Sequence, residues 1–186
     1  MTWKAYMHNG NREALCGNFD GAQFAFRKAL KEVEKFGPID SRLEEALDAL
    51  VNLSWTHNKQ ATAVAYIDRL LAIKTQKFGM NSLQLVELLD RKAESLFDLG
   101  KTIEAEALCR KILHIQRTYL GDDDSEVATT SNKLANVCHA NRNYVDAEKF
   151  YKQALAAHTK NLGCNDPTVC PSGPSSGRTA AGYVVF

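Results

Sequence analysis

Small and apolar residues recur along the chain with the spacing of helix faces. Four alanines mark the pattern, namely Ala22, Ala63, Ala105 and Ala147. Seven and eight residues beyond them stand the pairs Ala29 and Leu30, Leu70 and Leu71, Ile112 and Leu113, and Ala154 and Leu155. Because such a separation is about two turns of an α-helix, these side chains share one helix face. The pattern predicts helices with buried stripes, and no segment of the sequence shows the alternation of a half-buried strand.

A glycine period of 42 residues divides the chain into similar units, marked by Gly37, Gly79, Gly121 and Gly163. Each unit reads as two helices that end before the glycine, a residue suited to the left-handed conformation after a helix end. The predicted pairs are residues 3–15 with 19–36, 41–57 with 60–78, 82–99 with 102–120, and 126–140 with 144–162, with Ser125 as the expected cap of the seventh helix. The period therefore predicts an all-α solenoid of antiparallel helix pairs.

Residue sizes indicate how these helices pack. Small residues at Gly10, Ala93 and Ala135 in the first helices, and the four alanines of the second helices, allow close approach. Five large residues are expected to fill the gaps between units: Phe26, Trp55, Ile67, Leu96 and Tyr151. Each would contribute about 1.5–3 kcal/mol through burial.

Composition narrows the class of protein. The chain has 23 basic and 22 acidic residues, so it lacks the basic excess of a general nucleic-acid or membrane-surface binder. Its five cysteines lack the spacing of a zinc site or a disulfide framework, which favours reduced thiols and a cytoplasmic location. We expect one repeat domain over residues 1–169. Residues 170–186 are rich in Pro, Gly and Ser and read as a flexible tail, either a cloning appendage or a natural ending.

The first unit resembles the tetratricopeptide repeat in its series Gly10, Gly17, Phe19, Ala22, Phe26 and Ala29. The period of 42 and segments such as NYVDAEKFYKQALAAHTKNLGCNDP are similar to the longer repeats of kinesin light chains. The resemblance covers residues 3–169 and implies a right-handed superhelix that binds other proteins. Unit two departs from the pattern at Asn58, Gln60 and Leu70, where we expect a looser junction.

In the resembled family the first helices line a concave surface. Counting along the first helices predicts that the partner-binding residues are Asn11, Asp48, Asn52, Trp55, Asp90, Glu94, Phe97, Asn132, Asn136 and His139. Asp48, Asp90 and Asn132 are spaced by the period, so they form a ladder that could hydrogen-bond an extended peptide. Acidic residues outnumber basic ones on this side, which favours a basic or polar segment. The alternative interpretation is an ordinary solvated helix face.

Catalysis is not expected, since the five histidines fall on different helix faces and no phosphate-binding glycine loop is present. No cofactor or metal site is predicted either. Two further hypotheses remain beside the interaction scaffold. The last second helix, around Phe150 and Leu155, lacks a predicted helix to cover it, so the chain could self-associate there, or Tyr183–Phe186 or missing repeats could cover it. RNA binding by a helical repeat is the weakest hypothesis, because the groove is acidic.

Overall fold

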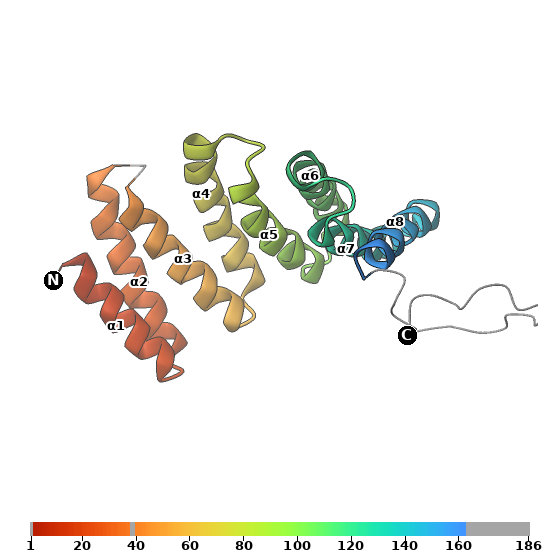
Figure 1. Ribbon diagram of the computed structural model, residues 1–186. Coiled ribbons are helices and arrows are strands. Elements are labelled where there is room, and N and C mark those ends of the chain that lie inside the picture. Colours follow the sequence, from red (N-terminus) through yellow and green to blue (C-terminus); the bar gives the residue numbers. More distant parts are fainter. Residues whose placement is uncertain (1, 38–39, 163–186) are drawn as a thin grey trace, which may run out of the picture.

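The computed structural model describes residues 2–37 and 40–162, and within these ranges it contains helices and no strand. The helices are α1 (Trp3–Leu15), α2 (Phe19–Val33), η1 (Glu34–Phe36), α3 (Ser41–Thr56), α4 (Gln60–Phe78), η2 (Leu83–Leu85), α5 (Val86–Asp98), α6 (Thr102–Leu120), α7 (Ser125–Ala140) and α8 (Tyr144–Leu162). They follow one another in a row from the N-terminus, each packed on the next (Figure 1). The predicted all-α superhelical solenoid is confirmed. Residues 163–169 of the expected repeat domain and the expected tail, 170–186, lie outside the described residues.

Left-handed glycines end the second helix of successive units. Gly79 and Gly121 both have φ near 87°, and their amides donate to the carbonyls of Thr75 and Arg117. Glycine pays no Cβ penalty in this conformation, which explains its recurrence at the period. Gly163, the last of the series, lies outside the described residues.

Short polar side chains cap the helix entries with the same period. The carboxylate of Asp40 accepts from the amide of Arg42 at 2.8 Å, and that of Asp124 accepts from the amide of Glu126 at 2.7 Å. Ser82 caps η2 in the intervening unit. The prediction of Ser125 as a cap is wrong by one residue, because Ser125 already lies in the first turn of α7. Hydrogen bonds from the side chain and backbone of Arg42 lower the pKa of Asp40 to about 2.

The core confirms most of the predicted packing residues. Phe26, Ile67 and Leu96 are at most 2% exposed, whereas Trp55 is half-buried. Gly10 lies against Phe26, and a Cβ at this position would be only 2.5 Å from the ring. Tyr151 was wrongly predicted to be buried and is 38% exposed, since no described helix covers that face of α8.

Polar contacts accompany the apolar packing at the junction between units two and three. The side chain of Gln60 bonds Asn58, Ser95 and Asp98, each at 3.0 Å. A second tie across the same junction joins Lys92 to Asp68. A set of hydrogen bonds therefore crosses from α4 to α5, and the expected looser packing of this junction stays a prediction.

Candidate partner-binding groove

Two adjoining hollows follow the seam between the first helices of units three and four. The larger, of about 450 Å³, lies between the N-terminal halves of α5 and α7 over α6, and the smaller, of about 150 Å³, lies beside their C-terminal halves. Asp90 and Lys133 line both hollows. We call this continuous surface the α5–α7 groove. Four of the predicted partner-binding residues line it, namely Asp90, Glu94, Phe97 and Asn136.

Lys133 bridges the groove. Its Nζ lies 2.6 Å from Oδ2 of Asp90 and 2.6 Å from Oε1 of Glu94. Burial alone would lower the pKa of Lys133, but the hydrogen bonds to both carboxylates outweigh it, so the pKa is raised. One ammonium between two carboxylates leaves the triad with a net negative charge. The structure thus brings together two predicted site residues, Asp90 and Glu94. Lys133 of the next unit occupies part of their hydrogen-bonding capacity.

The same contact recurs one unit earlier. Nη1 of Arg91 donates to Oδ1 of Asn52 at 2.6 Å, across 39 residues, and Lys133 reaches Glu94 across the same separation. Both members of the second pair stand one period beyond those of the first. The sequence analysis compared only the numbers of acidic and basic residues on this side and did not predict that Arg91 and Lys133 tie neighbouring units together. The sequence signal for these contacts was a repeated separation of 39 residues between a cationic residue and a carboxylate or amide, from Asn52 to Arg91 and from Glu94 to Lys133.

The remaining predicted residues differ in their surroundings. Phe97, Asn136 and the half-buried Glu94 line the smaller hollow, and Oδ1 of Asn136 accepts from the Tyr151 hydroxyl at 2.5 Å. Asp48 and Trp55 are half-buried on α3, where burial raises the pKa of Asp48.

Six of the ten predicted residues line neither hollow, namely Asn11, Asp48, Asn52, Trp55, Asn132 and His139. Asn11 and Asn132 are exposed on α1 and α7 and line neither cavity. The ring of His139 packs edge-on against Tyr144 of α8, with centroids 5.2 Å apart. Their assignment to a binding surface stays a prediction.

Acidic side chains dominate the α5–α7 groove. The carboxylates that line the two hollows are Glu87, Asp90, Glu94, Asp98 and Glu126. The cation that lines them is Lys133, and Arg91 adjoins through an ion pair with Glu87 at 3.2 Å. A surface of this kind attracts cations and presents acceptors to N–H donors.

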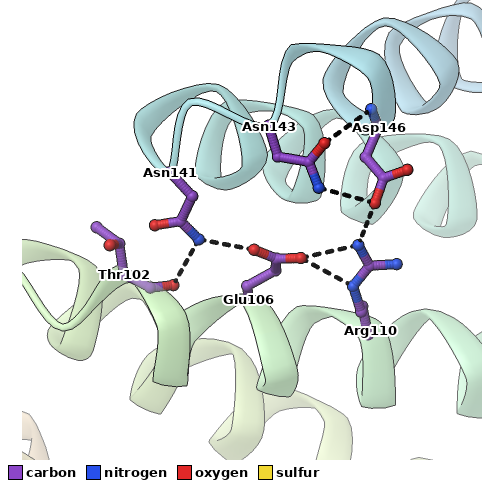
Figure 2. Close-up of polar contacts among 6 residues, drawn as sticks. All are labelled: Thr102, Glu106, Arg110, Asn141, Asn143 and Asp146. Atoms are coloured by element: carbon purple, nitrogen blue, oxygen red, sulfur yellow. Dashed lines mark hydrogen bonds and ion pairs between the residues drawn. The ribbon is translucent and has the colours of Figure 1, made fainter.

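A separate polar cluster fixes the turn between α7 and α8 onto α6 (Figure 2). Nη2 of Arg110 contacts Glu106 at 2.8 Å and Asp146 at 2.6 Å, and Nδ2 of Asn141 donates to Glu106 at 2.7 Å. Burial would raise the pKa of Glu106, but the hydrogen bonds from Arg110 and Asn141 lower it. The cluster therefore holds ionised groups in a fixed arrangement at the junction between units three and four.

Glu106, Asp146 and the thiol of Cys138 lie close enough to be considered as metal ligands, with their ligand atoms within 4.8 Å of one another. The chemistry does not fit that role. Arg110 already binds both carboxylates, and burial raises the pKa of Cys138 to about 11, so the thiol is protonated at neutral pH. Burial likewise raises the pKa of Cys109 to about 11. The cluster is explained as a structural junction.

Comparison with known families agrees with this geometry. Residues 84–160, which include the α5–α7 groove, match the sequence model of the tetratricopeptide repeat family. This part of the chain matches tetratricopeptide repeats. Mouse nephrocystin-3 is 32% identical over 97 residues, which cover 52% of this chain and 7% of nephrocystin-3. The chain therefore spans a small part of the length of that relative.

Solved structures with tetratricopeptide-type architecture share the fold. The kinesin light chain-like repeats of Podosopora anserina match with a TM-score of 0.70 at 16% identity, over 89% of this chain and 79% of theirs. BtubC (BKLC) from P. vanneervenii matches with a TM-score of 0.66 at 20% identity, over 85% and 63%. A Rap protein complexed with competence and sporulation factor matches with a TM-score of 0.55 at 18% identity, over 86% and 44%. Among the described residues, no helix is both long and apolar enough to span a bilayer.

Proposed function

We propose that this tetratricopeptide array is a protein-interaction scaffold that holds an extended basic or polar segment of a partner in the α5–α7 groove. Repeats of this family generally serve as scaffolds for other proteins, which sets the class of function. The observation that carries the finer proposal is the pair of adjoining hollows with a surplus of carboxylates. A basic segment gains Coulomb attraction there, and an acidic segment is repelled.

The groove offers two kinds of contact to such a segment. Asp98 and the outer oxygens of the Lys133 triad supply acceptors for N–H groups of a backbone or a cationic side chain. Phe97, which is 38% exposed, and Ala93 give the smaller hollow an apolar part where an alkyl group can be covered. Alternating polar and small apolar side chains on an extended segment would use both kinds of contact.

The test uses a fluorescent peptide of alternating arginine and alanine and a matched peptide of alternating glutamate and alanine. Fluorescence anisotropy at low salt should show binding of the basic peptide alone, weakened by added salt. The double change Glu94→Gln and Asp98→Asn should reduce that binding severalfold. Glu104→Gln, an exposed glutamate on α6 paired with Lys101, is the control and should leave binding unchanged. Equal binding of both peptides, or no effect of the groove variant, would refute the proposal.

A second candidate function is association of two copies through α8. Tyr144, Tyr151 and Leu155 share one face of α8 and are 58%, 38% and 64% exposed. One period earlier, Cys109 and Leu113 occupy the positions of Tyr151 and Leu155 on α6 and are at most 4% exposed. Within the described part of the chain, the face that α7 covers on α6 is therefore open on α8.

The opposite end of the array is unsuited to covering this face. The exposed side chains of α1 are mostly polar, namely Lys4, His8, Asn11 and Arg12, and they adjoin the exposed Leu15. Association would then join α8 to α8 about a two-fold axis rather than end to end. Mass measured by sedimentation against concentration should show a dimer that Leu155→Glu abolishes and Val145→Glu, on another face of α8, does not. A strict monomer at every concentration would exclude this candidate.

A further inference from the structure

Apolar side chains line the smaller hollow of the α5–α7 groove. They are Ala93, Phe97, Cys109 and Val137, and all except Phe97 are at most 6% exposed. Burial raises the pKa of the Cys109 thiol to about 11, so this group is uncharged at neutral pH. The smaller hollow is therefore an apolar site beside the carboxylates of the groove.

The smaller hollow lies where side chains are smaller than those of the preceding unit. One period before Ala93, Phe97 and Cys109 stand Val51, Trp55 and Ile67. Val51 and Ile67 are 0% exposed and belong to the core of the first two units. Each of the three differences removes atoms, and together they remove more heavy atoms than a leucine side chain contains. Because protein interiors are close-packed, this loss of volume explains the space between α5 and α7.

We infer that the smaller hollow is a specificity pocket for a leucine-sized aliphatic side chain of the bound segment. The inference rests on the proposed groove function and specifies which side chain enters the groove. The hollow measures about 150 Å³. A cavity of about this volume holds a benzene molecule, so the isobutyl group of leucine fits. Its entry removes the apolar lining from water, which favours binding.

The charges beside the hollow specify the neighbours of that aliphatic residue. Glu94 and Asp98 line the same hollow, and Asp98 is exposed. A long cationic side chain next to the aliphatic residue reaches these carboxylates, whereas an acidic neighbour is repelled. The expected ligand is an aliphatic residue flanked by basic residues. Alanine in the same place would leave most of the hollow empty.

The experiment measures the binding of three fluorescent peptides to the full chain by anisotropy. They are the alternating arginine–alanine peptide and two derivatives in which one central alanine is replaced by leucine or by asparagine. The leucine peptide should bind about tenfold more tightly than the parent, because its added carbons are removed from water. Asparagine resembles leucine in shape but loses hydration when buried, so its peptide should bind no more tightly than the parent.

A variant that fills the hollow provides the decisive comparison. Ala93→Val with Cys109→Ile introduces the side chains that the chain itself carries at Val51 and Ile67. The advantage of the leucine peptide should fall below about twofold, because the space is occupied. The parent peptide should bind as before, since Glu94 and Asp98 are unchanged. Ala93→Val alone is a milder variant that should remove part of the advantage.

The matched control is Leu134→Ile, a change of shape at a fully buried position of α7 that lines neither hollow. It should keep the full advantage of the leucine peptide. Circular dichroism verifies that each variant is folded. An advantage lost in the filled variant and kept in the control supports the inference.

The other outcomes separate this inference from the proposed function. Equal affinities of the three peptides, or a leucine advantage that persists in the filled variant, would overturn the pocket and leave the acidic groove intact. Failure of all three peptides to bind would overturn the proposed function together with the inference. Peptide affinities unaffected by filling, together with loss of a dimer in sedimentation, would assign the hollow to a second copy of the chain and overturn the inference.

Discussion

The contact between Gly10 and Phe26 allows a sharp test of how α1 packs on α2. A Cβ at Gly10 would lie 2.5, 2.6 and 2.9 Å from three ring carbons of Phe26, well inside the 3.4 Å at which ordinary contact begins. The ring is 2% exposed and so has little room to move. Alanine gains about 1 kcal/mol of helix propensity over glycine, whereas overfilling a packed core costs about 1–3 kcal/mol. Gly10→Ala should therefore lower the free energy of unfolding by up to about 2 kcal/mol.

A double-mutant cycle in urea denaturation checks the cause of this loss. Phe26→Leu removes the ring and should itself destabilise the fold, by about 1–3 kcal/mol. If the ring is the obstacle, adding Gly10→Ala to Phe26→Leu should cost much less than Gly10→Ala alone, with a coupling energy near 1 kcal/mol. The control is Ala93→Gly at the equivalent position of α5, which should destabilise through lost propensity. A Gly10→Ala protein at least as stable as the parent would refute the packing argument.

Three further changes test other parts of the structure by denaturation. Lys133→Met should lower the free energy of unfolding by about 1 kcal/mol, since Asp90 and Glu94 lose their shared cation at a part-exposed site. Because the pKa of Lys133 is raised above 10.5, this loss should be present at neutral pH, where the ammonium and both carboxylates are charged, and should disappear as pH rises through the folded value; a loss unchanged in strong alkali would contradict it. Asp48→Asn should stabilise at neutral pH, because burial raises the pKa of Asp48, and the gain should vanish at low pH where the carboxyl is protonated. Arg142→Gly should stabilise by about 0.5–1 kcal/mol, since Arg142 has a φ of 62°, and an unchanged midpoint would argue against strain there.

Periodicity made the fold predictable. The glycines specify where the second helices end, and the alanines specify where neighbouring helices pack closely. Both signals depend on local properties, namely backbone conformation and residue size. At Asn58, where the sequence departs from the pattern, the backbone still takes the left-handed conformation, with φ of 54°, that glycine takes at Gly17 and Gly100, which the sequence analysis did not predict. The missed cap, Asp124, shows the limit of such reading, because adjacent polar residues can serve as a cap equally well.

The groove was less predictable because its properties depend on contacts between units. Asp90 and Glu94 were placed on the correct face, but their pairing with Lys133 depends on how far α7 is displaced along α5, which a single helix pattern does not specify. The exposure of Tyr151 likewise depends on whether another helix follows α8. The buried amide of Gln116 was invisible because glutamine is ordinarily a surface residue.

Arg91 binds Asn52 and Lys133 binds Glu94 across the boundaries between neighbouring units. One repeat therefore cannot be exchanged without changing the contacts of its neighbour. A chimera that replaced α7 and α8 with a unit from another protein would alter the charge presented by α5, although no residue of α5 had been changed. A sequence change in one unit therefore alters the charge and hydrogen bonding of the preceding unit. To transfer the binding specificity of this array to another protein, neighbouring units have to be moved together.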